Sequence, residues 1–264
     1  GWSPTSVQGP MARNVSDCAL LLAAMSGPDP RVPISLTDDG GLFLKSLDRD
    51  FKNINIAWSP TLGGLPVEDD TLKTLNSQLH VFEEIGCNIT EEDPDFADAN
   101  EVFLRWRGWE RVINQGDLLE KHRGTLKDSM IWDIEQGLKL SASDVAWAET
   151  KRVEIFRRME KFMQKYDFLI CPVSQCPPFD INQPWVKEIN GVEMNNYIDW
   201  MRSCYYITVT GHPAISVPCG FTERGLPVGI QIVGRYRDDF GVLQLAKAFE
   251  SATEFWKIMP DVCK

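Results

Sequence analysis

The stretch INIAWSPTLGGLPVEDDTLKTLNSQLHVFEEIGCNIT, residues 54–90, decides the fold class. Its first five residues form a short apolar run that predicts a strand, and a loop rich in proline and glycine follows at 60–68. Residues 69–85 place leucine and phenylalanine at helical spacing, Gly86 ends that helix, and residues 87–90 can form a second strand. A strand, loop, helix and strand in this order predict two parallel strands joined by a crossover.

The rest of the chain continues the alternation of helices and strands. The same periodicity predicts helices at 14–26, 96–120, 141–166, 195–206 and 239–252, and strands at 167–173, 214–217 and 228–233. The helix at 14–26 is apolar nearly all round, so we expect it to be deeply buried. Ser141 or Ser143 can cap the helix that follows them. Nothing resembles a flexible linker, so we predict one α/β domain over residues 1–264.

Composition and charge exclude several classes of protein. The chain of 264 residues has 38 acidic against 27 basic residues and a net charge of -11, which argues against nucleic acid and anionic membranes as partners. No apolar run approaches the length of about 20 residues that a membrane span needs, and the N-terminus lacks the pattern of a signal peptide. Seven scattered cysteines fit a reducing cytoplasm. Three distant histidines lack metal-ligand spacing, so we expect no metal and no cofactor.

The common catalytic motifs are missing. The sequence has no GxSxG nucleophile elbow, no phosphate-binding loop of the GxxxxGK[ST] type, and no GxGxxG after a strand. The acidic clusters at 69–70 and 91–93 lie at the ends of elements, where a solvated turn is the favoured interpretation. His212 precedes a proline in an apolar stretch, and we expect it to pack or to form a hydrogen bond rather than to catalyse.

Three blocks of sequence resemble the amidase signature family. The first is GPMAR at 9–13, followed by an apolar helix and by Gly27-Pro28-Asp29. The second is GHPAISVPCGF at 211–221, preceded by LICP at 169–172, and the third is GLPVGIQIVGR at 225–235. Together they are spread over nearly the whole chain. The resemblance implies a mixed β-sheet sandwiched between helices, and it implies that this chain is the C-terminal part of an amidase domain.

Enzymes of that family hydrolyse carboxamides through an acyl-enzyme, using a serine nucleophile, a second serine in a cis peptide, and a lysine. A serine hydroxyl needs a base to become nucleophilic, and a buried neutral lysine can serve through the bridging serine. In the family the nucleophile lies in a Gly-Gly-Ser motif upstream of GPMAR, and the lysine lies further upstream. The two Gly-Gly pairs here, at 40–41 and 63–64, are each followed by leucine. No catalytic residue can therefore be assigned within this chain, and the chain alone is expected to be inactive.

The resemblance does suggest substrate-binding residues. In relatives the helix before the GHPAISVP block lines the acyl side of the site. Ile198, Met201 and Tyr205 are spaced i, i+3, i+7 and would share one helix face. Ordinary core packing is the alternative for each, and Tyr205 is favoured because its hydroxyl adds a polar group. Thr208 is the fourth substrate-binding candidate, at a position where relatives often have an asparagine near the site. Trp106, Trp109 and Trp132 could line an entrance, although core packing is the favoured interpretation.

Two classes of function follow. In the first, the whole enzyme is an amidase that hydrolyses the C–N bond of a small apolar or aryl carboxamide to acid and ammonia, with its catalytic residues upstream of this chain. In the second, the chain is a non-catalytic amidase-fold subunit or pseudoenzyme with a binding or assembly role. A free-standing hydrolase with an unrecognised site is a weaker third hypothesis. The expected partners are a small amide substrate and the N-terminal part of the same enzyme, and a homodimer is left open.

Overall fold

A five-stranded mixed sheet organises the chain, and the computed structural model describes residue 2 and residues 5–259. The strand order is β2-β1-β3-β7-β6. β1 pairs in parallel with β2 and β3, whereas β7 is antiparallel to both β3 and β6. The strands are β1 (Asn55–Trp58), β2 (Asn88–Glu91), β3 (Phe168–Pro172), β6 (Ala214–Phe221) and β7 (Pro227–Gly234). The predicted parallel crossover and the mixed sheet between helices are confirmed.

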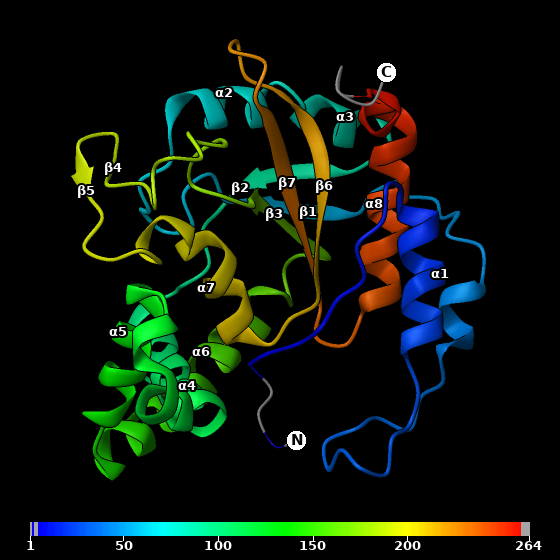
Figure 1. Ribbon diagram of the computed structural model, residues 1–264. Coiled ribbons are helices and arrows are strands. Elements are labelled where there is room, and N and C mark those ends of the chain that lie inside the picture. The colour runs from blue at the N-terminus through cyan, green and yellow to red at the C-terminus, as the bar shows by residue number, and fades with distance from the viewer. Residues whose placement is uncertain (1, 3–4, 260–264) are drawn as a thin grey trace.

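Helices cover both faces of the sheet (Figure 1). On one face, Ile56 and Ile170 pack with α1 (Val15–Met25), α3 (Leu79–Glu84) and α8 (Asp239–Thr253). On the other, Ala57 and Leu169 pack with α4 (Ala99–His122), α6 (Ala142–Phe162) and α7 (Arg202–Thr210). Neighbouring strand residues enter opposite cores because side chains alternate along a strand. The sheet therefore supports two separate hydrophobic layers.

The helix predicted at 69–85 is in fact two helices. α2 spans Asp69–Asn76 and has Ser77 as its C-cap, and α3 begins at Leu79. The Ser77 hydroxyl donates to the Thr74 carbonyl at 2.7 Å, and the Gln78 amide turns to the carbonyl of Leu75 instead. Serine side chains compete in this way for the backbone acceptors of a helix. The apolar spacing continues across the break, which explains why one helix was predicted.

The other elements agree with the sequence to different degrees. Ser141 caps α6 with a complete capping box, which settles the choice between the two serines. The helix predicted at 195–206 starts as the 3-10 turn η3 (Asp199–Met201) and continues as α7 to Thr210. The sequence analysis missed several smaller elements: α5 (Asp128–Leu138), the hairpin of β4 (Glu188–Ile189) and β5 (Val192–Glu193), and the 3-10 turns η1 (Gly40–Leu44), η2 (Arg123–Thr125) and η4 (Phe255–Lys257).

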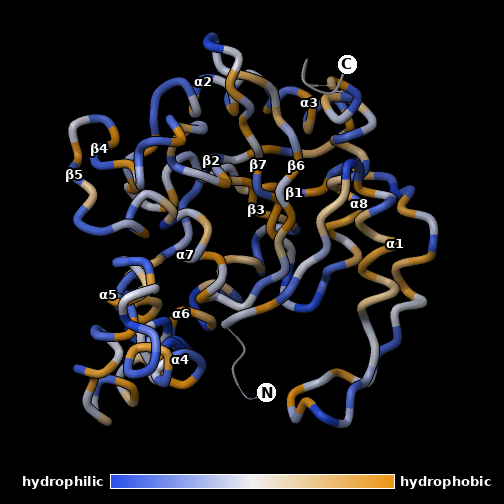
Figure 2. The backbone as a smooth tube through the Cα atoms, viewed as in Figure 1, coloured by the Kyte–Doolittle hydropathy of each residue, from blue (hydrophilic) through white to orange (hydrophobic). Residues whose placement is uncertain are grey.

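The expected deep burial of α1 is wrong. Only Val15 and Ala19 are buried, whereas Leu20 is 59% and Met25 50% exposed. Figure 2 shows α1 at the edge of the molecule, with α8 between it and the sheet, and its contacts are chiefly with α8 and η1. An all-apolar helix predicts contacts on every side, but the described residues leave part of α1 exposed. None of the helices within the described residues combines the length and the apolar character that a membrane span requires.

Candidate substrate-binding surface

Tyr205 lies on the buried side of α7. Its ring stacks on Phe103 of α4, with centroids 4.1 Å apart and planes 5° from parallel, and only 3% of the residue is exposed. Its hydroxyl donates a hydrogen bond of 2.7 Å to the Asn100 side chain. Burial therefore raises the pKa of Tyr205 far above its ordinary value, and the phenol stays neutral. These contacts orient the residue toward α4.

Ile198, Met201 and Tyr205, which the sequence placed on one helix face, differ in exposure: Ile198 and Tyr205 are buried, whereas Met201 is half-buried. Ile198 precedes η3 and is 1% exposed, whereas Met201 is the last residue of η3 and is half-buried. Two contacts hold the start of α7 in place: the Arg202 amide donates to the Gln175 side chain at 2.7 Å, and the Ser203 hydroxyl donates to Val173.

The accessible side of α7 carries a different set of residues. Cys204 is exposed and Thr208 is half-buried, and both follow Met201 at a spacing of i+3 and i+7. The Cys204 thiol donates to the Val173 carbonyl at 2.9 Å, and the Thr208 hydroxyl approaches the Cys204 carbonyl at 3.4 Å. Of the four predicted residues, Met201 and Thr208 thus belong to this side, whereas Ile198 and Tyr205 lie behind it.

Strand β6 extends this accessible surface. Val217 and Cys219 point into the core under α8, so the alternate residues Ala214, Ser216 and Pro218 face the side that α7 covers, and all three are exposed. We call the surface formed by Met201, Cys204, Thr208, Ala214, Ser216 and Pro218 the α7–β6 surface. The sequence analysis missed Cys204 and Ser216. The alternation along 214–219 was the available signal for Ser216.

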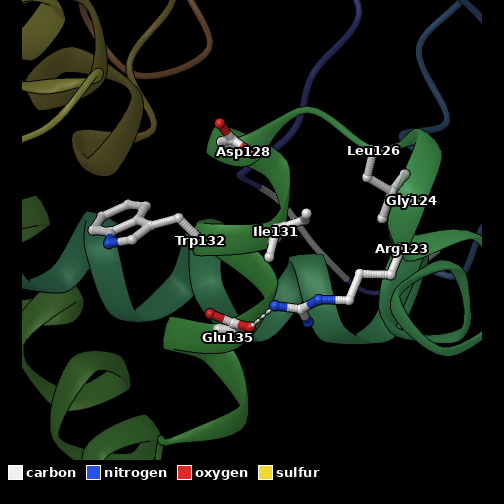
Figure 3. A pocket seen from close by; sticks show the side chains of 7 residues that line it. All are labelled: Arg123, Gly124, Leu126, Asp128, Ile131, Trp132 and Glu135. Carbon is white, nitrogen blue, oxygen red and sulfur yellow. Dashed lines mark hydrogen bonds and ion pairs between the residues drawn. The ribbon is translucent and has the colours of Figure 1, made fainter.

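A larger cavity lies elsewhere, where η2 leads into α5. It has a volume of about 590 Å³, and Figure 3 shows Trp132, Ile131 and the ion pair of Arg123 with Glu135 around it. Trp132 lines this cavity, and its place at an entrance to the substrate site stays a prediction. Trp106 instead belongs to the core, and Trp109 packs against it. None of the described residues that line this cavity belongs to the α7–β6 surface, so the two are separate.

The described residues contain no recognisable nucleophile with its base. No hydrogen bond described in the structure joins a serine or cysteine side chain to a lysine or histidine; the shortest serine contact, from Ser59 to Asp93 at 2.5 Å, lies at the end of β1. Burial raises the pKa of both Cys171 and Cys219 to about 12, so these thiols stay protonated and unreactive. Nor do the described histidines, cysteines and carboxylates form a group of three that could hold a metal ion.

Comparison with known proteins identifies the family. The amidase family model matches residues 3–243. This chain belongs to the amidase family. It is 34% identical over 248 residues to an acylamidase of Rhodococcus erythropolis, covering 92% of this chain and 51% of that protein. It is 28% identical to a glutamyl-tRNA(Gln) amidotransferase subunit of Thermodesulfovibrio yellowstonii, covering 96% of this chain and 56% of that one.

Solved structures of amidase signature enzymes share the fold. A bacterial aryl acylamidase described as a member of that family superposes with a TM-score of 0.82 at 25% identity, over 94% of this chain and 53% of its own. The 6-aminohexanoate cyclic dimer hydrolase superposes with a TM-score of 0.81 at 17% identity, which shows the fold alone. This amidase-family chain thus spans about half the length of the relatives it matches.

Proposed function

We propose that this chain is part of an amidase that hydrolyses the C–N bond of a small apolar or aryl carboxamide. The observation that carries the proposal is the 34% identity to an acylamidase across 92% of the chain. A named activity in a relative is informative only with a compatible site, because one fold hosts several functions. The α7–β6 surface offers a thioether, a thiol and two hydroxyls without a charged side chain, which suits a neutral amide.

In the proposed reaction, a serine attacks the amide carbonyl while a neutral lysine, acting through a second serine, accepts the proton. The amine then leaves with that proton, and water hydrolyses the acyl-serine to the acid. We place the lysine and both serines upstream of Gly1, in the remainder of a domain of which this chain is the C-terminal part. Met201 and Thr208 would contact the substrate, with Ile198 and Tyr205 supporting them from behind. We place the enzyme in the cytoplasm.

The first test compares the 264-residue chain with the full polypeptide that its gene encodes. Each sample is checked by intact mass under denaturing conditions, then assayed with acetanilide and phenylacetamide, and labelled with a serine-reactive fluorophosphonate. We expect turnover and labelling in the full polypeptide only. Turnover by the 264-residue chain alone would contradict the placement of the nucleophile, and a full polypeptide that neither turns over amides nor labels would contradict the proposal.

A second candidate function is a non-catalytic subunit. Two relatives favour keeping it: the amidotransferase protein is named as a subunit, and a structural neighbour at 17% identity is described as a vestigial protein complex. This function predicts a gene without an upstream lysine and Gly-Gly-Ser motif, and a chain that purifies with a partner. Fluorophosphonate labelling of the full polypeptide would argue against it.

A further inference from the structure

Gln175 is a buried amide side chain that joins three segments of the chain. It lies three residues after Pro172, the last residue of β3, and has no exposed surface. Its side-chain N–H donates to the carbonyl of Pro66 at 3.0 Å, and its side-chain oxygen accepts from the amide of Arg202 at 2.7 Å. Its backbone carbonyl accepts from the amide of Glu68 at 2.8 Å. Gln175 thus ties the loop before α2 and the start of α7 to the segment that follows β3.

The bond to Arg202 replaces a cap that α7 does not provide for itself. The first turn of a helix is commonly fixed by a polar side chain at the N-cap, which accepts from one of the first N–H groups. The N-cap of α7 is Met201, whose side chain makes no capping hydrogen bond. Arg202 is the first residue of α7, so Gln175 supplies from another segment the side-chain acceptor that Met201 lacks.

The same turn of α7 is also bound to the chain just before Gln175. The Ser203 hydroxyl and the Cys204 thiol both donate to the carbonyl of Val173, at 2.8 Å and 2.9 Å. Burial raises the pKa of the Cys204 thiol, so the sulfur stays protonated although the residue as a whole is exposed. The state of this thiol therefore reports where the first turn of α7 stands.

The residues held in this way belong to the α7–β6 surface. Met201 directly precedes Arg202 and Cys204 follows it by two residues, so both move with the first turn of α7. A methionine side chain adapts to irregular space through its three rotatable bonds, so its place depends on a fixed backbone. A displacement of about 1 Å in a residue that positions a substrate can change a rate about 100-fold.

We propose that Gln175 is a positioning residue of the amidase, which fixes the first turn of α7 so that Met201 and Cys204 present one defined surface to the substituent of the amide. Gln175 does not itself touch the substrate. The inference rests on the proposed amide hydrolysis, but the positioning of α7 can be measured without turnover. A glutamine that served stability alone would leave the preference between substrates unchanged.

The first measurement is the preference of the full polypeptide for phenylacetamide over acetamide, taken as the ratio of the two kcat/KM values. The concentration of folded enzyme cancels in this ratio, so partial unfolding does not change it. Gln175→Met keeps the length of the side chain and removes both of its hydrogen bonds. We expect the ratio to fall about tenfold, because a displaced surface loses contacts to the larger substituent first. An unchanged ratio would overturn the proposal.

Two further variants separate the bond to α7 from the bond to the loop. Gln175→Glu keeps an oxygen that can accept from the Arg202 amide, and we expect it to recover most of the preference. The matched control is Asn190→Gly, because Asn190 donates to the Val67 carbonyl of the same loop at 2.8 Å and has a φ of 47°, which glycine adopts freely. This control should keep the ratio. Equal losses in Gln175→Met and Gln175→Glu, or a loss in Asn190→Gly, would contradict the role of the Arg202 bond.

The second measurement is alkylation of Cys204 by N-ethylmaleimide, followed by peptide mass spectrometry of the full polypeptide. Thiolates react and buried thiols do not, so a released first turn should speed the alkylation of Cys204 about fivefold in Gln175→Met. Cys171 and Cys219 have no exposed surface and report global unfolding. An unchanged rate at Cys204, or an equal acceleration at all three cysteines, would refute the positioning of α7 by Gln175.

The two measurements also distinguish this inference from the proposed function. A full polypeptide without amide turnover would refute the proposed hydrolysis, and the alkylation of Cys204 would then decide alone whether Gln175 fixes α7. Turnover with an altered ratio and a faster reaction of Cys204 in Gln175→Met is the result that we expect. Faster alkylation with an unchanged ratio would show that α7 moves without consequence for the substrate, which would overturn the proposal.

Discussion

His212 is the buried residue whose titration should couple most directly to folding. Its side chain has no exposed surface and lies between the rings of Phe156 and Tyr236, with Nε2 3.0 Å from Glu160 and Nδ1 3.2 Å from the Thr210 carbonyl. Desolvation lowers the pKa of His212 from its ordinary value, although the Thr210 carbonyl and the Glu160 carboxylate act in the opposite direction. The folded chain therefore favours the neutral imidazole.

That preference predicts a loss of stability in acid. The unfolded histidine has a pKa of about 6.5, so below that pH the unfolded chain binds a proton that the folded chain resists. The free energy of unfolding should fall as the pH drops from about 7 to about 5, by at most about 1.4 kcal/mol per pH unit from this group. Urea unfolding of the chain and of His212→Gln isolates the effect, because every other group titrates in both. Parallel pH profiles for the two proteins would refute it.

Met201 and Tyr205 should respond differently to substitution. Tyr205→Phe removes the bond to Asn100 and should lower the free energy of unfolding by about 1 kcal/mol, with little change in KM for an aryl amide. Met201→Ala should raise KM severalfold and change stability less, because the side chain is half-buried on the α7–β6 surface. Urea unfolding and amide kinetics of the full polypeptide measure both. An equal rise of KM in the two variants would place Tyr205 against the substrate.

Among the elements, α4 and α5 make a close crossing that depends on glycine. A Cβ at Gly137 would lie 2.0 Å from the backbone oxygen of Gly108, and one at Gly108 would lie 3.0 Å from Gly137. Backbone on both sides leaves no flexible side chain that could move aside. Gly137→Ala must therefore separate the two helices, and we expect a loss of about 3 kcal/mol or more in the free energy of unfolding.

Gly116 offers a matched control in the same helical hairpin. A Cβ there would meet only the Val112 side chain, at an ordinary 3.7 Å. Gly116→Ala should stabilise the chain by about 0.5–1 kcal/mol, because alanine loses less backbone freedom in a helix than glycine does. Thermal unfolding of both variants measures the difference. The free energy of unfolding should decrease in Gly137→Ala and increase in Gly116→Ala. Similar changes in the two variants would contradict the close crossing.

At the scale of the whole molecule, the chain exposes surfaces that invite association. Among the described residues no strand pairs with the outer edge of β6, and Leu20, Met25 and several other large apolar residues are accessible around α1. Open sheet edges and apolar patches are typical contact surfaces. We expect the isolated chain to self-associate in sedimentation velocity experiments, and to do so more with increasing concentration.

A charge on the β6 edge should reduce that association. Ala214→Lys places an ammonium group on the exposed side of the strand, and lysine is a common protection of natural sheet edges. Ser251→Lys, on the exposed side of α8, makes the same change of net charge elsewhere and serves as the control. If the unsubstituted chain were a monomer with a sharp two-state melt, the expected self-association would be contradicted.

Local sequence patterns determined the elements themselves. The strand at 167–173, the helix at 141–166 and the crossover at 54–90 were predictable because alternation, helical spacing and capping residues act over a few neighbours. The order of the sequence blocks around Pro213 and Pro227 also indicated the family, which the match over residues 3–243 confirmed.

The tertiary structure alone decided which side of each element meets a partner. Periodicity groups residues on a face, but only packing determines that Tyr205 points to α4 while Cys204 and Ser216 stay accessible. It also decided that α1 is only partly covered, with Leu20 and Met25 left exposed. Contacts between residues far apart in the chain depend on the geometry of the whole sheet, which no short stretch of sequence contains.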